Sequence, residues 1–320
     1  RTIANDWDLS TIDDISFVGD GKFTLTGLVD LSADLTLSVE NSRGVVIDGI
    51  IDGSRGVTKV GAGTLTLNGV NDFSRTLEVR EGLLLLQGST RRDVSVRNTT
   101  ATLGGTGIIG RDLRVEIGAT VAPGVNGIGT RSVGDDLALS SGVYAAEVAA
   151  DGTSDLIQVV DETDLGIFSR IDVRPANEQV IADGTAFTLI TSDDGITDEG
   201  ITIEGSALLQ FMRDPLFVDG DTAYTIVATR RDVAEVVPSV PGGDGLLVAL
   251  DDIIDDNIET PGGPIAGLVS MLDGLETDEE VIDAVRGFSP EAYSVFTTTG
   301  IRAAEEFNGV TSSYLQSRRG

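Results

Sequence analysis

The most regular pattern in the chain is a short segment, framed by two glycines, in which every second position is apolar. It reads Gly-Thr-Leu-Thr-Leu-Asn-Gly at Gly63–Gly69 and Gly-Leu-Leu-Leu-Leu-Gln-Gly at Gly82–Gly88. A looser copy spans Gly21–Gly27. Short alternating strands with glycine corners that recur about every 20 residues are typical of a β-solenoid.

The alternation continues along most of residues 1–235. Each stretch is too short for a helix and has one apolar face, so each predicts a half-buried strand. No room is left for crossover helices, which predicts an all-β fold whose strands stack as coils of a parallel β-helix. Residues 1–19 are expected to form a cap or the first coil, and residues 165–232 a less regular end. The clearest strands are Leu35–Val39, Leu77–Val79, Val94–Val96, Leu113–Ile117, Leu137–Leu139, Leu156–Val159, Ala186–Thr191 and Ala223–Ala228.

A proline- and glycine-rich stretch at residues 236–244 marks a linker, after which the apolar period becomes helical. Residues 245–320 therefore predict a small helical segment. Thr277 followed by Glu280 has the pattern of a capping box and predicts a helix start there. Ser289 and Pro290 predict the start of a further helix.

Composition removes several kinds of chemistry. The chain has no Cys and no His, which excludes disulfides, Ser-His-Asp catalysis and His- or Cys-ligated metals. Its formal charge of −30, from 52 acidic and 22 basic residues, disfavours nucleic acid as a partner. The chain opens at Arg1 without a visible signal peptide, so we expect a processed or excised fragment.

Carboxylates are the remaining candidates for chemistry. A glycan-active enzyme would need clustered carboxyl groups, but adjacent residues on a strand point to opposite faces, so the Asp doublets do not form such a cluster by themselves. We therefore predict no catalytic residue. Calcium is the one cofactor that the sequence suggests, through two acidic loops without EF-hand spacing. The candidate ligands are Asp193, Asp194, Asp198, Asp219 and Asp221, and the doublets are Asp13-Asp14, Asp135-Asp136, Asp193-Asp194, Asp251-Asp252 and Asp255-Asp256.

The two best copies of the repeat differ on their outer side. Alternation places Leu84 and Leu86 inward, like Leu65 and Leu67 of the first copy. Leu83 and Leu85 then face outward, where the first copy carries threonines. Outward leucines are either covered by a neighbouring segment or form an adhesive strip, which predicts self-association through Leu83 and Leu85.

These motifs together resemble the passenger domains of type V autotransporters. The glycine-framed units and their lead-in resemble the family's β-strand repeat, and three later segments follow in the family's order. The resemblance covers roughly residues 57–320. The segments are Val57–Ala62, Gly63–Gly69, Gly82–Gly88, Gly118–Thr130 with its Ala-Pro-Gly and Ile-Gly-Thr elements, Gly152–Leu156, and Phe288–Tyr293 in the helical segment that precedes the outer-membrane barrel.

The resemblance implies a right-handed β-helix, exported through the periplasm and outer membrane and displayed outside a Gram-negative-type cell. It also implies the outer-membrane barrel of the same precursor as a partner, although no barrel sequence follows Gly320. We expect a non-catalytic, structural or adhesive surface protein that forms homo-oligomers or surface assemblies. Two alternatives stay open: an extracellular glycan-active enzyme, and a stalk for a missing N-terminal effector.

Overall fold

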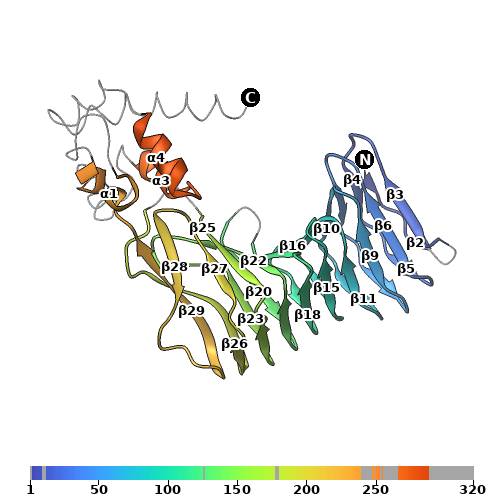
Figure 1. Cartoon of the computed structure of the whole chain (residues 1–320). Helices are drawn as coiled ribbons and strands as arrows, with labels where there is room; N and C mark the ends of the chain where they lie inside the picture. The colour runs from blue at the N-terminus through green and yellow to red at the C-terminus, as the bar shows by residue number, and fades with distance from the viewer. Residues whose placement is uncertain are drawn as a thin grey trace.

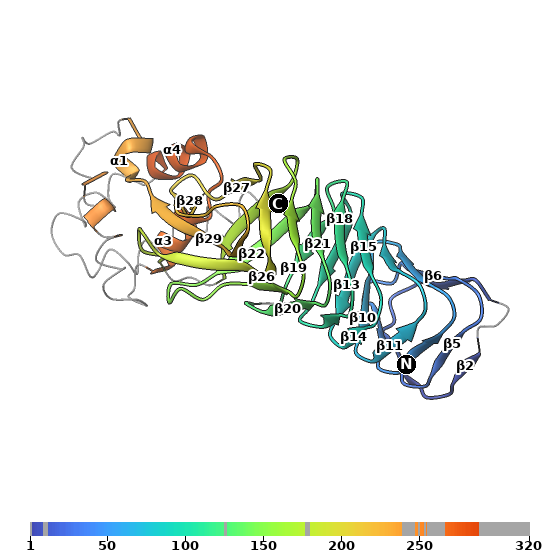
Figure 2. The ribbon, with the colours of Figure 1, turned by 90° about the horizontal axis from the view of Figure 1, so that it is seen from below.

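The computed structural model describes residues 2–8, 12–124, 127–176, 180–238, 247–248, 250–252, 254 and 266–287. Short strands stack into an elongated body, and a small helical unit lies at its C-terminal end (Figure 1). Seen from below, the first coils lie at the end opposite to the helices (Figure 2). The predicted β-solenoid is confirmed.

Each coil contributes one strand to each of three parallel ladders. The first ladder forms a ten-stranded sheet of β1 (Thr2–Ile3), β4 (Phe23–Leu25), β7 (Val45–Ile47), β10 (Thr64–Leu67), β13 (Gly82–Leu86), β16 (Ala101–Gly104), β19 (Thr120–Ala122), β22 (Val143–Val148), β25 (Arg170–Pro175) and β27 (Thr202–Glu204). The second contains β2 (Trp7–Asp8), β5 (Val29–Leu31), β8 (Ile51–Gly53), β11 (Val70–Phe73), β14 (Ser89–Thr90), β17 (Ile108–Ile109), β20 (Thr130–Val133) and β23 (Leu156–Val159). The third contains β3 (Asp14–Phe17), β6 (Leu35–Val39), β9 (Val57–Val60), β12 (Leu77–Val79), β15 (Val94–Arg97), β18 (Leu113–Glu116), β21 (Leu137–Ser140) and β24 (Thr163–Leu165).

The glycine-framed repeat sets both the core and the corners. Leu65 pairs with Leu84 and Leu67 with Leu86, and all four side chains are fully buried. Glycine is required at the corners because consecutive coils touch there through their backbones. A side chain at Gly69 would collide with the carbonyl of Gly49 in the coil before it. The same inward positions therefore recur from coil to coil and form one continuous core.

Two basic side chains point inward and satisfy corner carbonyls. The Lys59 ammonium donates to the carbonyls of Gly61, at 2.6 Å, and Glu81, at 2.8 Å. The Arg131 guanidinium lies in the interior and donates to the carbonyls of the Gly104–Gly107 corner. Burial lowers the pKa of Lys59 to about 8 and that of Arg131 to about 10.

The C-terminal end of the solenoid changes its pairing. The long strand β26 (Ala186–Asp198) pairs in parallel with both β23 and β24. On its other side it pairs antiparallel with β29 (Asp221–Arg230), which also pairs antiparallel with β28 (Leu209–Arg213). The strands expected at Ala186–Thr191 and Ala223–Ala228 are thus present. They do not end the stack as irregular coils, because an antiparallel hairpin covers the last coil instead.

The helical unit packs beside this hairpin through a second apolar cluster, which includes Ala207 and Leu208 just before β28. It contains α1 (Val233–Val236), α3 (Ala266–Asp273) and α4 (Asp278–Arg286), together with helical residues near Leu247 and Leu250. The capping box of Thr277 and Glu280 is formed as expected. The helix expected from Ser289 lies outside the described residues. In the part of the chain that the structure describes, no helix is long and apolar enough to cross a membrane.

Candidate functional site

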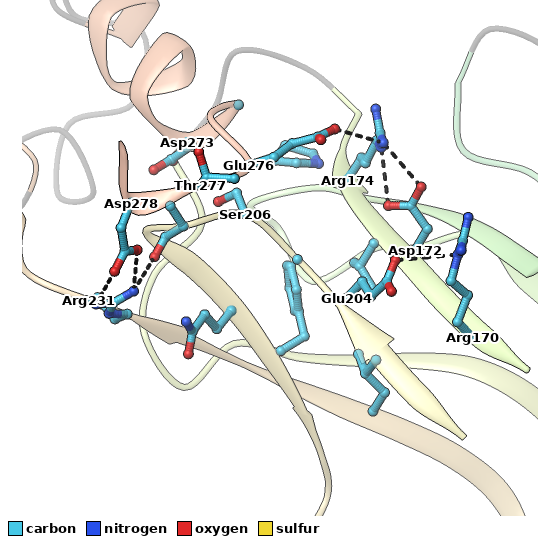
Figure 3. A pocket seen from close by; sticks show the side chains of 18 of the residues that line it. Arg170, Asp172, Arg174, Glu204, Ser206, Arg231, Asp273, Glu276, Thr277 and Asp278 are labelled. Atoms are coloured by element: carbon cyan, nitrogen blue, oxygen red, sulfur yellow. Dashed lines mark hydrogen bonds and ion pairs between the residues drawn. The ribbon is translucent and has the colours of Figure 1, made fainter. Parts of the chain in front are cut away.

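A polar groove separates the last coils from the helical unit. Its volume is about 940 Å³. One wall is formed by β25 and β27, and the other by the end of α3 and the turn into α4 (Figure 3). The β25 wall is charged because its residues alternate in direction. Arg170, Asp172 and Arg174 project from the outer side of the ten-stranded sheet, whereas Ile171 and Val173 point inward.

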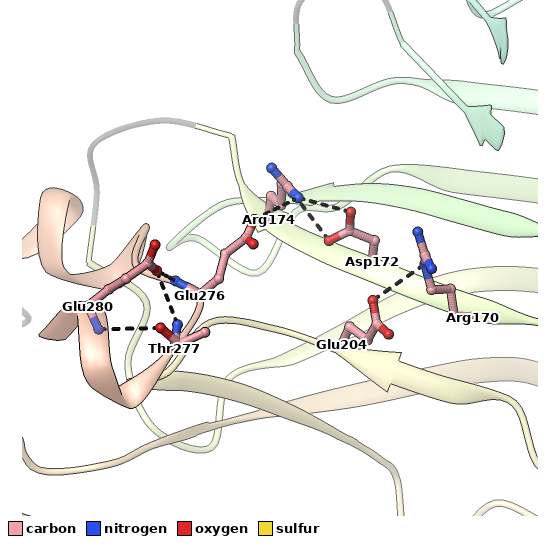
Figure 4. Close-up of polar contacts among 7 residues, drawn as sticks. All are labelled: Arg170, Asp172, Arg174, Glu204, Glu276, Thr277 and Glu280. Atoms are coloured by element: carbon pink, nitrogen blue, oxygen red, sulfur yellow. Dashed lines mark hydrogen bonds and ion pairs between the residues drawn. The ribbon is translucent and has the colours of Figure 1, made fainter. Parts of the chain in front are cut away.

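Two arginines of β25 are paired with carboxylates of the groove. Arg170 lies 3.4 Å from Glu204 on the neighbouring strand. Arg174 lies 3.2 Å from Asp172 and 3.3 Å from Glu276, so it links the solenoid to the turn before α4 (Figure 4). The hydrogen bond from Arg174 to Asp172 raises the pKa of the guanidinium. These arginines are half or more exposed and line the space without filling it.

Two further pairs fix the helical unit beside the groove. Arg231 lies 2.8 Å from Asp278 and also donates to the carbonyl of Ala207. Behind the wall, Arg230 donates to both oxygens of Asp273, at 2.6 and 3.0 Å, and both side chains are almost fully buried. Each of the five carboxylates that line the groove therefore has a guanidinium partner. None of them is placed as a lone acid or base.

The sequence did not indicate this groove, because its walls come from residues that lie about a hundred positions apart. Alternation in Arg170–Arg174 could have shown that the charged residues share the outer side of one strand. Nothing in the sequence places Glu276 opposite them. The capping box does fix the backbone of Glu276, which lies just before α4. The Glu280 carboxylate accepts from the backbone N–H of Glu276 at 3.0 Å (Figure 4).

The calcium candidates lie close along the chain but do not converge on one point. Asp198 is the most buried of them and accepts hydrogen bonds from the N–H groups of Gly200 and Ile201, from Arg213 and from Tyr224. Burial opposes ionisation, but these donors outweigh it and lower the pKa of Asp198. Asp219 and Asp221 accept from loop N–H groups, and Asp193 and Asp194 are exposed. Among the described residues, no group of three or more acidic side chains is arranged to hold a metal ion.

Two of the acidic doublets lie in stacked coils, Asp135-Asp136 in a corner and Asp193-Asp194 in an irregular part of β26. The N–H of Asp161 donates to the carbonyl of Asp135, and the N–H of Asp194 donates to the carbonyl of Asp161. Partial desolvation and the neighbouring Asp135, Asp194 and Asp136 raise the pKa of Asp161. None of these aspartates lines the groove between the coils and the helical unit. The doublet Asp255-Asp256 lies outside the described residues.

Leu83 and Leu85 point to the outer side of β13, as their alternation predicts. Each is half-buried, and they pair in register with Thr64 and Thr66 on one side. On the other side they lean over Gly104, where an added Cβ would lie 2.9 Å from Leu85 Cδ2. Because Gly104 has no side chain, the two leucines can pack against its backbone. Part of each leucine side chain remains exposed to solvent.

A buried aspartate joins two of the family-like segments. Asp155 belongs to Gly152–Leu156, and its carboxylate accepts from the N–H of Gly129, at 2.7 Å, in the segment that follows the Ala-Pro-Gly element. It also accepts from the N–H of Glu147 at 3.0 Å. The side chain is almost fully buried, and burial raises the pKa of Asp155 to about 6. The sequence marked both segments but did not show that one carboxylate ties them together.

Known proteins resemble this chain in two ways. The family described as passenger-associated-transport-repeat matches residues 57–86, which are the lead-in, the first glycine-framed unit, the strands that follow it and most of the second unit. Two proteins of Serratia marcescens, each named extracellular serine protease, align over 154 residues with 35% and 30% identity. The alignment covers 46% of this chain and 14% of each relative, so the chain corresponds to a small part of those proteins.

Proposed function

We propose that this chain, a passenger domain of a type V autotransporter displayed outside a Gram-negative cell, is a non-catalytic structural and adhesive element that associates with copies of itself. The barrel of the same precursor is its proposed partner in the outer membrane. The absence of His from the sequence supports a non-catalytic role, because a Ser-His-Asp triad cannot be assembled from this chain.

The outer side of the ten-stranded sheet supports the proposed self-association. Within β4, β7, β10, β13, β16 and β19, no outward position carries a charge, although the chain as a whole carries −30. Two copies can approach along such a side without burying like charges. The outward residues are Thr24, Val46, Thr64, Thr66, Leu83, Leu85, Thr102, Gly104, Thr120 and Ala122.

The third ladder provides a contrast on the same coils. Its outward positions carry Glu78, Arg97, Arg114 and Glu116, which pair with one another or with neighbouring charges. Such exposed pairs keep their hydration and gain little from a partner surface. Contact between copies is therefore proposed for the uncharged side, with Leu83 and Leu85 as its most apolar part.

The test replaces the two leucines with the residues of the first repeat copy. Leu83→Thr with Leu85→Thr should leave the folded solenoid intact, because Thr64 and Thr66 occupy the same places one coil earlier. Sedimentation velocity and light scattering should show that the variant stays monomeric at concentrations where the parent chain associates. Ile108→Thr is a matched control, because Ile108 is an apolar residue, 54% exposed, on β17 of the second ladder and so outside the ten-stranded sheet.

Three results would contradict the proposed contact or the proposed self-association. Unchanged association in the leucine variant, or loss of association in the Ile108→Thr control, would remove Leu83 and Leu85 from the contact. A parent chain that remains monomeric throughout would remove self-association altogether.

A second candidate function is that of a stalk carrying an N-terminal effector. It is favoured by the alignment with a small part of two much longer proteins named extracellular serine protease. Intact mass measurement of the native cell-surface protein tests it. A mature chain that begins well before Arg1 and has protease activity would support the stalk, and a mature chain that begins at Arg1 would contradict it.

A further inference from the structure

The groove between the solenoid and the helical unit is balanced in charge but rich in hydrogen-bonding groups. Its five carboxylates are all paired: Glu204 with Arg170, Asp172 and Glu276 with Arg174, Asp278 with Arg231, and Asp273 with Arg230 behind the wall. An anionic ligand would meet these carboxylates in a chain that already carries −30. A cationic ligand would find each carboxylate already paired with a guanidinium.

Pairing leaves many donors and acceptors facing the open space. A guanidinium has five N–H donors, and the contact of Arg170 to Glu204 uses one of them. The side chains of Arg170 and Arg174 are 50% and 65% exposed. A carboxylate beside a guanidinium presents an acceptor and a donor a few ångströms apart, which matches the neighbouring hydroxyls of a sugar. Gln210 adds an exposed amide to the same wall.

The groove also has the shape that such a ligand needs. A volume of about 940 Å³ is near the upper end of ordinary ligand pockets, which span roughly 300–1,000 Å³. The ion pairs cross its ends and line its walls, so the space between the two units stays open (Figure 3). Pro175 and Ile203 are only partly buried and add apolar surface against which the C–H groups of a sugar ring could lie.

We infer that this groove binds a short, neutral, polyhydroxylated ligand, namely an oligosaccharide without carboxylate or sulfate groups. The inference rests on the adhesive part of the proposed function, and it gives that adhesion a ligand class. It does not use Leu83 or Leu85, which lie on distant coils. Binding here is recognition without bond cleavage, because no carboxylate of the groove is left without a guanidinium.

Binding of the 320-residue chain to an immobilised panel of neutral and acidic oligosaccharides tests the inference, followed by titration calorimetry with the best neutral hexasaccharide. We expect binding to neutral glycans only. Gln210→Ala should weaken it several-fold, because this change removes an exposed amide that lines the groove. Asp172→Asn should weaken it at least tenfold, because it removes a charged acceptor while Arg174 keeps Glu276.

Glu78→Gln is the matched control, since Glu78 also pairs with arginine but lies on the third ladder. Equal weakening by this control, equal binding of acidic glycans, or no neutral glycan bound by the parent chain would each overturn the inference. Sedimentation of the same samples separates the two proposals. Lost self-association with retained glycan binding would contradict only the leucine contact, and the reverse would contradict only the glycan site.

Discussion

The stacked coils and the helical unit are held in place by different means. In the coils, the same inward apolar positions recur along one continuous core, so many equivalent contacts contribute to stability. The helical unit is joined to the last strands by an apolar cluster and by a few individual contacts, of which Arg230 with Asp273 is the most buried. The stability of the coils is therefore spread over many similar contacts, whereas the attachment of the helical unit depends on single residues.

The largest effect is expected from breaking the junction at Arg230. In Arg230→Ala, Asp273 would remain buried without its partner, which costs about 3–5 kcal/mol. We expect hydrogen exchange at residues 266–286 to accelerate by roughly 10²- to 5 × 10³-fold, from that cost at about 1.4 kcal/mol per factor of ten, while exchange in the central coils stays unchanged. Replacing both partners, Arg230→Met with Asp273→Leu, should restore protection. Exchange that stays slow in Arg230→Ala would contradict the proposed role of this pair.

A core substitution in the coils should act differently. Leu84→Ala removes a fully buried side chain and should lower the free energy of unfolding by about 2–5 kcal/mol. The loss should appear in the main transition of a urea titration, because Leu84 packs against the coils on both sides. The outward neighbour Thr66→Ala is the control and should change the free energy by less than about 0.5 kcal/mol. Equal losses in both variants would mean that the two sides of the strand do not differ as described.

A pH titration tests the buried Asp155 of the coils. The pKa of Asp155 is raised to about 6, above its ordinary value of 3.8. In this interval the folded chain binds more protons at Asp155 than the unfolded chain does. This group therefore makes stability fall as pH rises from about 4 to about 6, by on the order of 2 kcal/mol.

Asp155→Asn should remove that slope from urea titrations repeated across the pH range. It should also cost stability at low pH, because an amide offers one oxygen where the N–H groups of Gly129 and Glu147 need two acceptors. A slope that survives the substitution would assign it to another group, such as Asp161, whose pKa is also raised.

The smallest effect is expected at the exposed edge of the junction. Arg174 bridges Asp172 and Glu276, but its side chain is 65% exposed, so Arg174→Ala should cost less than about 1 kcal/mol. The small loss should disappear in high salt, where screening already weakens the parent. A loss as large as that of Arg230→Ala would show that exposed and buried pairs share the junction equally.

The sequence predicted the repeated features of the fold and missed the contacts that occur only once. Alternation and glycine spacing placed Leu65, Leu84 and their partners inside, and the capping pattern placed the start of α4 at Thr277. Arg131 lies two residues before Val133 and shares its inward face, but no local pattern places the corner carbonyls that make burial of its charge favourable. The groove depends on Arg174 meeting Glu276, a contact that no local pattern encodes.

The antiparallel end also lay beyond local pattern. The segments Ala186–Thr191 and Ala223–Ala228 read as strands, and they are strands. Their direction of pairing depends on the path of residues 199–220, which turn back over the last coil. Alternation gives the faces of a strand but not its neighbours, so the change from stacked coils to hairpin was not visible in the sequence.

The carboxylate of Asp155 has a consequence for how such chains can be cut and rejoined. Most neighbouring coils meet through interchangeable apolar side chains, so one coil could be exchanged for another of the same spacing. Between Gly129 and Asp155 that freedom ends, because a donor in one segment needs an acceptor that lies 26 residues later. A recombinant boundary placed between them should separate the pair, whereas a boundary on either side keeps it whole. These residues should therefore be exchanged as one unit, as should the coils that Lys59 and Arg131 join.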